Sequence, residues 1–308
     1  MQIISSEKVQ STLEYPGLID ELDKAFAASF TMPQRTVFQL DETAETHDGF
    51  ALLPAWNDQV IALKSFTYFP DNQTPHKTLY SKILLFDRQH GEPLALVDGT
   101  SVTFWRTGGV SALAARYLAR KDSRTLVILG TGNLAPYLAR AHTSALPLTK
   151  VLIWGRNQAK AQQVVDSIAI PDVELSVATD LEAACAQADI LVSATGSPDI
   201  LVYGDWIRPG THTDFLGNHL ATRRECDSKL IQNARVFVDT YANCLQEAGE
   251  ILLPMKEGVF AKEALQGELA ELCAGSVTGR TTDSEITLFK SVGNALSDLV
   301  AANCAYLG

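Results

Sequence analysis

A glycine-rich segment at residues 130–135 has the composition and spacing of a dinucleotide-binding loop. The apolar run TLVIL at 125–129 precedes it, and a helix-like segment follows it. In such loops the first glycine permits a tight turn, the second lets the backbone approach a pyrophosphate, and a small third residue lets helix and strand pack closely. A tight strand–helix turn without a ligand is the alternative interpretation. We expect a dinucleotide phosphate to bind at the helix start, next to Gly130, Thr131, Gly132, Asn133, Leu134 and Ala135.

The residues after the next predicted strand indicate which coenzyme is bound. Chains that bind NAD usually carry an acidic residue about 20 residues after the glycines, where it binds the ribose 2′-hydroxyl. This chain has Gly155, Arg156 and Asn157 there instead. A guanidinium binds phosphate through two parallel hydrogen bonds, so we expect NADPH, with NADH as the less favoured coenzyme. The alternative interpretation of Arg156 is an exposed residue at the start of the next helix.

Cationic residues at other positions could bind an anionic substrate. Lys64 lies in a predicted strand on the same face as apolar residues, where the alternative is a lysine that extends its ammonium to water. Arg106 and Thr107 precede a predicted amphipathic helix. With Thr107 as the N-cap, arginine and helix start would form an anion site for a carboxylate or a cofactor phosphate. Arg35 is uninformative alone, because a solvated arginine is the default. His219 follows the fifth predicted strand, where catalytic residues often lie, but a lone histidine there is more often structural.

Two patterns along the chain predict the elements that position these residues. Three β-rich runs occupy 60–69, 80–87 and 93–99, and six short apolar strands alternate with helical segments after residue 123, at 125–129, 150–154, 173–177, 188–194, 212–217 and 234–240. The alternation predicts right-handed crossovers and a parallel sheet. The fold class is therefore α/β, a Rossmann-type doubly wound sheet plus a second α+β domain. Thr195 and Gly217 end two of the strands, so we expect them to border the cofactor.

Composition excludes several other classes of function. The chain has 308 residues and a formal net charge of −11, which repels a phosphate backbone, so we expect no binding to nucleic acid or to a membrane surface. Its apolar runs are far shorter than the ~20 residues of a membrane helix, and the N-terminal residues do not resemble a signal peptide. Five scattered cysteines without a CxxC pair and six histidines without HxxxH or HExxH spacing predict neither disulfides nor a metal site. We expect a cytoplasmic protein.

Taken in order, motifs along nearly the whole chain resemble the ornithine cyclodeaminase/μ-crystallin family. The motifs are MPQRT (32–36), LLPAW (52–56), LKSFTYFPDN (63–72), LVDGTSVTFWRTGG (96–109), the glycine loop, WGRN, SATGS, HTDFLGN with RRE, and EITLFKSVGNALSDL (285–299). The resemblance implies a homodimer with two domains in each chain. Residues 1–120 with 292–308 would form the substrate-binding and dimerisation domain, and residues 121–291 the NADP-binding Rossmann domain.

The resemblance also assigns roles to single residues. It implies that Arg35, Lys64 and Arg106 hold a substrate carboxylate near the nicotinamide, and that Ser291 lies close to the nicotinamide. Cyclodeaminases carry an aspartate in a GGDxPGKTE-like stretch, where this chain has His219. They also recycle tightly held NAD, whereas the residues after the second strand point to NADPH. Both departures favour the family's reductases of cyclic ketimines. We expect the glycine pair 108–109 to loosen the helix start after Arg106.

These observations lead to one expected activity. The chain would be an NADP-dependent oxidoreductase that acts on C=N bonds and transfers hydride to C2 of a small cyclic imino acid. It would reduce Δ1-pyrroline-2-carboxylate to L-proline, and Δ1-piperideine-2-carboxylate to L-pipecolate. The candidate catalytic residues are Lys64 and His219, with an ordered water as a third candidate for the proton donor. The alternatives are an ornithine or lysine cyclodeaminase, an alanine-dehydrogenase-like enzyme, and a non-catalytic NADPH-dependent small-molecule binder of the μ-crystallin type.

Overall fold

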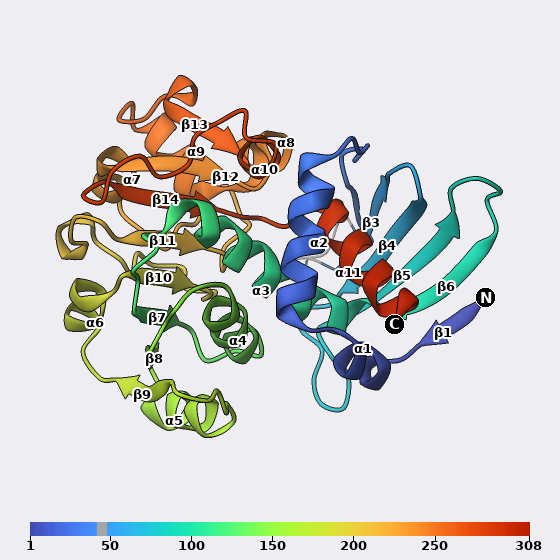
Figure 1. Ribbon diagram of the computed structural model, residues 1–308, viewed down its shortest axis with the longest axis horizontal. Helices are drawn as coiled ribbons and strands as arrows, with labels where there is room; N and C mark the ends of the chain where they lie inside the picture. The colour runs from blue at the N-terminus through green and yellow to red at the C-terminus, as the bar shows by residue number, and fades with distance from the viewer. Residues whose placement is uncertain (42–47) are drawn as a thin grey trace. The chain divides into compact units, whose positions relative to one another are not determined.

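The computed structural model describes residues 1–41 and 48–308, which fold into two compact units (Figure 1). Unit 1 consists of Met1–Thr107 and Asn294–Gly308, and unit 2 of Gly108–Gly293. The boundary lies inside helix α3 (Gly99–Leu118), and the last helix, α11 (Ala295–Leu307), is part of unit 1. Unit 1 is therefore built from both ends of the chain, and unit 2 from its middle.

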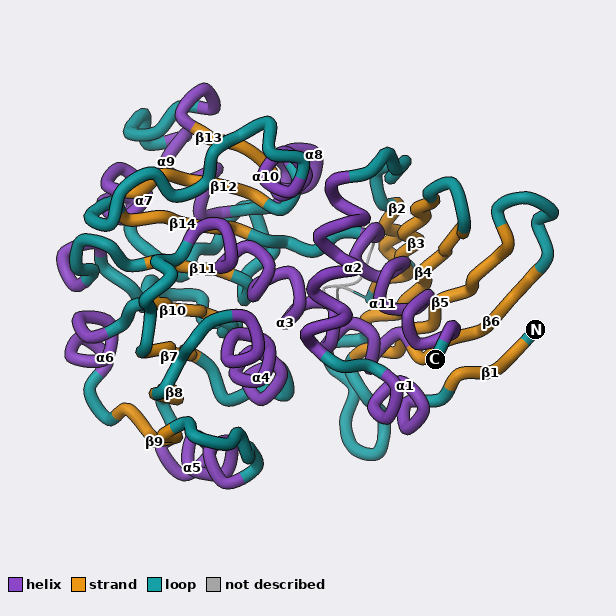
Figure 2. Tube along the Cα trace, in the orientation of Figure 1, coloured by secondary structure: helices purple, strands orange, loops and turns teal. Residues whose placement is uncertain are grey.

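Unit 1 is a six-stranded sheet with helices on one face (Figure 2). Its strands run in the order β1-β6-β5-β4-β3-β2, antiparallel except for the parallel pair of β1 and β6. The helices α11 and α2 pack against each other, and α11 lies on strands β3 to β6. The bounds are β1 (Gln2–Ile4), α1 (Ser6–Thr12), α2 (Tyr15–Ala27), β2 (Thr36–Gln39), β3 (Gly49–Trp56), β4 (Val60–Tyr68), β5 (Leu79–Asp87) and β6 (Pro93–Asp98).

The two faces of this sheet differ in burial because side chains alternate along each strand. The cross-strand row Leu53, Lys64, Ile83 and Val97 is buried beneath the helices. The neighbouring row on the other face is half-buried and consists of Pro54, Leu63, Leu84 and Leu96. The predicted strands at 60–69, 80–87 and 93–99 are confirmed, and the first of them carries its lysine on the apolar, helix-covered face.

Unit 2 confirms the predicted doubly wound parallel sheet. Its eight strands run in the order β13-β12-β14-β11-β10-β7-β8-β9, and every neighbouring pair is parallel. Successive residues of the central strand enter different cores: Val127 belongs to one apolar cluster and Ile128 to the other. The strands are β7 (Thr125–Leu129), β8 (Lys150–Trp154), β9 (Glu174–Ala178), β10 (Ile190–Ser193), β11 (His212–Phe215), β12 (Ala234–Val238), β13 (Leu265–Glu268) and β14 (Ile286–Lys290).

The chain of unit 2 alternates between strands and helical segments, as crossovers between parallel strands require. They are α4 (Ala135–Ala145), α5 (Gln158–Asp166), α6 (Leu181–Gln187), α7 (Ser228–Asn233), α8 (Tyr241–Glu247), α9 (Gly249–Lys256) and α10 (Leu269–Cys273), with 3₁₀ turns at Gly204–Trp206 and Lys262–Ala264. The six strands predicted after residue 123 are all present. Strands β13 and β14 were not expected from the sequence.

Helix α3 begins earlier than predicted. It starts at Gly99, and the preceding Asp98 accepts a hydrogen bond from the backbone N–H of Ser101 at 2.9 Å. The prediction that Thr107 is an N-cap is therefore wrong, since Thr107 lies inside the helix. The same finding corrects the expectation for glycines 108 and 109, which are buried within α3 and do not loosen its start.

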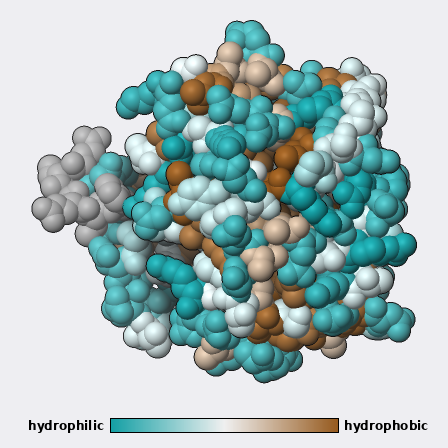
Figure 3. All heavy atoms as spheres, turned by 90° about the vertical axis from the view of Figure 1, so that its left-hand side faces the viewer, coloured by the Kyte–Doolittle hydropathy of each residue, from teal (hydrophilic) through white to brown (hydrophobic). Residues whose placement is uncertain are grey.

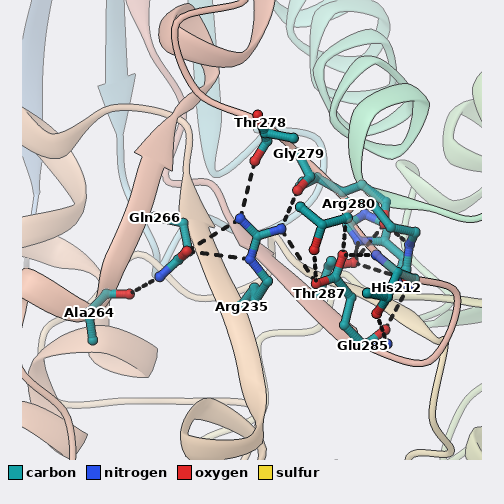
Figure 4. Close-up of polar contacts among 12 residues, drawn as sticks. His212, Arg235, Ala264, Gln266, Thr278, Gly279, Arg280, Glu285 and Thr287 are labelled. Atoms are coloured by element: carbon teal, nitrogen blue, oxygen red, sulfur yellow. Dashed lines mark hydrogen bonds and ion pairs between the residues drawn. The ribbon is translucent and has the colours of Figure 1, made fainter.

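A polar cluster near the amino ends of β11, β12 and β14 holds the segment before β14 in place (Figure 4). Arg280 donates hydrogen bonds to the carbonyl oxygens of Leu118 and Glu285 at 2.8 and 2.6 Å. Thr287 bonds to the ring of His212 at 3.0 Å, and burial lowers the pKa of His212 well below its usual value. These groups satisfy the backbone of a connecting segment, so we assign the cluster a structural role.

A chain in which 20% of the residues are charged is expected to have a polar surface. The face drawn in Figure 3 is mainly hydrophilic, with smaller hydrophobic areas between the polar side chains. None of the helices in residues 1–41 and 48–308 combines the length and apolar character that crossing a membrane requires.

Candidate active site

The sheet of unit 2 brings the predicted cofactor residues to one edge. Strand register aligns six residues in a single row across neighbouring strands: Trp154, Leu129, Ser193, Phe215, Lys290 and Val238. Each of these residues ends its strand, and all of the strands are parallel. The carboxyl edge therefore carries Gly130, Gly155 and Ser291 directly after their strands, and Thr195 and Gly217 one residue further on. Ligands of open parallel sheets bind outside this edge, beside the point where strand order reverses, which here lies between β7 and β10.

The glycine loop fits the approach of a dinucleotide phosphate. Gly130 has a φ of 126°, and a Cβ there would lie 2.6 Å from the carbonyl oxygen of Ala194, so glycine is required. A Cβ at Gly132 would instead meet nothing within 4 Å, which leaves its backbone open to a ligand. Helix α4 begins next to this open position, and no side chain caps it. The N–H of Ala135 already donates to the carbonyl oxygen of Gly132, and Pro136 has none, so a ligand anion would meet the glycine loop that leads into the helix.

The loop after β8 is packed against the glycine loop. A Cβ at Gly155 would clash with the Cγ2 atom of Thr131, so the two loops need a glycine to approach each other. Arg156 is exposed beside this contact. Asn157 is the N-cap of α5 and accepts a hydrogen bond from the backbone N–H of Lys160 at 3.1 Å. The Asn157 carboxamide oxygen is therefore used by the helix, whereas the guanidinium of Arg156 extends into solvent.

A buried carboxylate, Glu225, joins the ends of β10 and β11. Its Oε1 atom accepts hydrogen bonds from Ser193 Oγ, Thr195 N and Thr195 Oγ1 at 2.6 to 2.9 Å, and its Oε2 atom accepts one from Gly217 N at 2.9 Å. Burial raises the pKa of Glu225, and the hydroxyl donors oppose that effect. Four donors on one carboxylate fix the two loops relative to each other, so Glu225 determines where Thr195 and Gly217 stand.

A buried ion pair also helps to hold the loops after β10 and β11. Lys290 and Glu250 are both fully buried, with Nζ and Oε2 separated by 2.9 Å. Burial opposes the charge of Lys290, but the carboxylates of Glu250 and Glu225 outweigh it and raise the pKa of the lysine. The ammonium also donates to the carbonyl oxygen of Asn218 at 2.6 Å, and the Asn218 amide donates to the carbonyl oxygen of Ser197 at 3.0 Å. The loops after β10 and β11 are thus tied to β14.

Ser291, expected near the nicotinamide, has its hydroxyl proton already in use. Its Oγ donates to Asp239 at 2.8 Å, and the same carboxylate oxygen accepts the backbone N–H groups of Val292 and Gly293. Asp239 follows β12 and is fully buried. The Ser291 oxygen can therefore offer a ligand a lone pair but not a proton.

In unit 1, Lys64 is held in a buried cluster with Asp298. The ammonium lies 2.8 Å from Asp298 Oδ1 and donates to Thr103 Oγ1 at 2.6 Å. The side chains of Lys64 and Asp298 are 6% and 1% exposed. Burial lowers the pKa of Lys64 to about 8; Asp298 opposes this effect and Arg106 adds to it. The alternative interpretation of Lys64, a lysine whose ammonium reaches water, is therefore wrong.

Arg106 shares the same carboxylate. Its Nε atom lies 3.1 Å from Asp298 Oδ1, and its side chain is 11% exposed. Within the described part of the chain, the two terminal guanidinium nitrogens have no hydrogen-bond partner, which leaves a planar fork for a carboxylate. Arg35 is half-buried and close enough to lower the pKa of Lys64 further. Unit 1 thus gathers the three cations that the sequence suggested for carboxylate binding.

The structure places His219 differently from the buried cations. It lies in the loop after β11 and is exposed to solvent. The residues that sequence reasoning missed are Asp298, Glu225, Lys290 and Asp239. Lys290 and Asp239 are charged residues at or just after the end of an apolar strand. Asp298 is an acidic residue within the apolar last helix, and Glu225 lies in a loop without such a signal. Each sits in a motif or strand already singled out, but nothing in the sequence revealed its partner.

Known proteins of this architecture share both the sequence and the fold. A Delta(1)-pyrroline-2-carboxylate reductase of Colwellia psychrerythraea is 51% identical over 308 residues, which cover 98% of each chain. The structure of the Thermococcus litoralis Delta(1)-pyrroline-2-carboxylate reductase, solved with NADH and L-proline, matches with a TM-score of 0.93 and 32% identity and covers 100% of this chain and 97% of its own. An archaeal alanine dehydrogenase dimer with bound NAD matches with a TM-score of 0.92 and 26% identity, covering 100% and 95%.

The family model for the ornithine cyclodeaminase/mu-crystallin family matches residues 2–307, which is nearly the whole chain. The resemblance drawn from the motifs is confirmed by this match. It agrees with the glycine loop at the carboxyl edge of unit 2 and with the cations gathered in unit 1. The chain belongs to the ornithine cyclodeaminase/mu-crystallin family.

Proposed function

We propose that this protein is a nicotinamide-dependent reductase of cyclic ketimines. It reduces Δ1-pyrroline-2-carboxylate to L-proline, and the six-membered Δ1-piperideine-2-carboxylate to L-pipecolate. The observation that carries the proposal is the buried pair Lys64 and Arg106, whose remaining donors suit the carboxylate next to a C=N bond. The 51% identity with a protein named Delta(1)-pyrroline-2-carboxylate reductase supports the choice of substrate. One methylene changes binding by only ~1–3 kcal/mol, so both ring sizes are accepted.

The coenzyme is a nicotinamide nucleotide, and we assign it as NADPH. When bound, it supplies the hydride that adds to C2 of the imine. The residues that would hold it are those of the glycine loop and the strand ends: Gly130–Ala135, Gly155, Arg156, Asn157, Thr195, Gly217 and Ser291. Solved relatives contain NADH or NAD, so the preference for the 2′-phosphate depends on Arg156 in this chain.

Lys64 serves the reaction in two ways. Its charge completes the carboxylate site with Arg106 and Arg35, and its ammonium is a proton source for the imine nitrogen. A pKa of about 8 leaves the group mostly protonated at neutral pH while making it a better acid than an ordinary lysine. His219 is exposed, so Lys64 is the buried one of the two candidate proton donors. Rate enhancement comes mainly from orientation and from fixed charges around the substrate.

One assay separates this function from its alternatives. We expect oxidation of NADPH, followed by its absorbance, with either cyclic ketimine, and stoichiometric formation of L-proline or L-pipecolate. A cyclodeaminase would instead release ammonia from ornithine or lysine without net NADPH oxidation. An alanine-dehydrogenase-like enzyme would oxidise the coenzyme with pyruvate and ammonia. A binding protein would hold NADPH without turnover, and the absence of oxidation with both ketimines would contradict the proposal.

Replacing Arg156 by alanine is expected to raise the KM for NADPH about 10- to 100-fold and to change the KM for NADH less than threefold. Losing a charged hydrogen bond to phosphate costs about 1.5–3 kcal/mol, and 1.4 kcal/mol is a factor of ten. NADH has no 2′-phosphate and is the internal control. Lys150→Ala removes a cation from the opposite end of the same strand, β8, and should change neither value. Equal losses for both coenzymes in Arg156→Ala would refute the role.

We also propose that the protein is a homodimer. The face of the unit 1 sheet opposite α2 and α11 carries the half-buried apolar row Pro54, Leu63, Leu84 and Leu96. Apolar residues on an uncovered face mark an interaction site, and a second copy of this chain is the partner that an alanine dehydrogenase dimer of the same fold favours. Sedimentation equilibrium at micromolar protein should give twice the chain mass of 33.4 kDa. A single monomeric species would contradict it.

A further inference from the structure

We propose that Asp298 is a positioning residue of the carboxylate site, which keeps Lys64 charged and fixes Arg106 beside it. The inference rests on the proposed function, because it gives Asp298 its purpose in that reaction. Asp298 lies on the last helix, α11, 234 positions from Lys64 in sequence. The chain thus returns its C-terminal helix to unit 1 with a carboxylate directed at the two cations.

The geometry shows one oxygen shared by two cations. Asp298 Oδ1 lies 2.8 Å from Lys64 Nζ and 3.1 Å from Arg106 Nε. Lys64 is on β4, Arg106 on α3 and Asp298 on α11, so three separate elements meet at this atom. A buried ion pair is costly to form unless its geometry is good and its remaining hydrogen bonds are satisfied. An isolated carboxylate would not be stable there, which indicates that the two cations and Asp298 form one unit.

Asp298 takes one donor from each cation and leaves the others for a ligand. Lys64 has three N–H donors, of which one goes to Asp298 and one to Thr103. Thr103 in turn donates its hydroxyl proton to the carbonyl oxygen of Gly99 at 2.7 Å, so it must accept from the lysine. Arg106 uses Nε and keeps its terminal fork. The remaining donors of both cations are therefore held in fixed directions, as a carboxylate site requires.

Electrostatics gives Asp298 a second effect on the lysine. The groups that act on Lys64 come from each element around it: Asp298 from α11, Arg106 from α3, and Arg35 from the segment before β2. Burial and the two arginines favour the neutral amine, and the carboxylate favours the ammonium. With Asp298 in place the pKa of Lys64 is about 8. Without the carboxylate, all of the remaining influences would lower that pKa further.

The test is the pH profile of Asp298→Asn, which keeps shape and a hydrogen-bond acceptor but removes the charge. An opposite charge at this distance moves a pKa by about 1–3 units. We expect the alkaline fall of kcat/KM to move to lower pH by at least one unit. The ratio of kcat/KM at pH 8 to kcat/KM at pH 6 should then be at least about fivefold lower in the variant than in the wild type. Protonation of the substrate imine is the same for both enzymes, so it cancels in this comparison.

Two controls distinguish positioning from a loss of folded structure. Asp87→Asn removes a half-buried carboxylate from the same unit, and we expect the pH profile to stay unchanged. In a Lys64→Arg background, Asp298→Asn should no longer move the alkaline limb, because arginine keeps its proton above pH 12. An unchanged alkaline limb in Asp298→Asn, or a shift that persists in the Lys64→Arg background, would overturn the inference.

A spectroscopic titration keeps this test independent of the proposed function. In protein with ¹³C-labelled lysine, the signal that disappears in Lys64→Arg identifies Lys64, and its titration midpoint can be followed without substrate. We expect a midpoint near 8, shifted downward by Asp298→Asn. A wild-type enzyme without reductase activity that still shows this shift would contradict the proposed reaction but not the charge coupling. An unshifted midpoint in an active enzyme would contradict the role of Asp298 alone.

Discussion

Replacing Arg106 by alanine is expected to lower kcat/KM for Δ1-pyrroline-2-carboxylate by at least 30-fold and up to several thousandfold. Removing one partner of a buried, hydrogen-bonded charge pair costs about 2–5 kcal/mol, and 1.4 kcal/mol is a factor of ten. Arg106 is 11% exposed and its terminal nitrogens are held in place through Nε. The affinity for NADPH, measured by fluorescence titration, should change less than threefold, because the coenzyme loops belong to unit 2.

The same measurement needs two comparison variants. Arg88→Ala removes an exposed cation from unit 1 and should leave kcat/KM within twofold of wild type. Arg106→Lys retains a charge but not the planar fork, and we expect it to recover only part of the loss. Asp298 keeps Lys64 as a partner in both Arg106 variants, so unit 1 should remain folded. Turnover in Arg106→Ala comparable to wild type would show that the substrate carboxylate is bound elsewhere.

The parts of the fold that could be predicted from sequence are those that local chemistry determines. The glycine loop was recognisable because turn, phosphate approach and helix packing each require a particular residue within six positions. Lys64 was noticeable because strand alternation placed it among apolar residues. The apolar stripe of α3 begins only at Val110, so this pattern places the start of the helix too late. The local signal of the true start is Asp98, which caps the helix through the backbone N–H of Ser101.

The parts that could not be predicted depend on pairing between distant residues. Strand β14 lies between β11 and β12, although it follows both of them in sequence, so no local pattern reveals its neighbours. Lys290 is a charged residue at the end of that strand, and its partner Glu250 is on α9. Likewise, the sequence shows Asp298 as one acidic residue in an apolar helix. Its role became visible only when the tertiary fold placed it against Lys64 and Arg106.

Replacing Lys290 by methionine is expected to destabilise the protein by about 3–5 kcal/mol, because it leaves Glu250 as an uncompensated buried charge. Both side chains are fully buried and lie 2.9 Å apart. For a unit of this size, each kcal/mol corresponds to about 2–4 °C in melting temperature. Thermal unfolding should therefore occur at a temperature lower by about 10 °C, and urea unfolding at a lower midpoint. A loss below 1 kcal/mol would contradict the role assigned to the ion pair.

The double variant Lys290→Met with Glu250→Gln separates stability from function. Removing both charges avoids the unpaired carboxylate, so we expect most of the stability to return. Glutamine still offers an oxygen to the backbone N–H of Glu225, but methionine cannot donate to the carbonyl oxygen of Asn218. The loops after β10 and β11 would then lack their link to β14. The double variant should therefore regain its melting temperature but bind NADPH more weakly than wild type. Recovery of both properties would show that the link between Lys290 and Asn218 does not position the coenzyme loops.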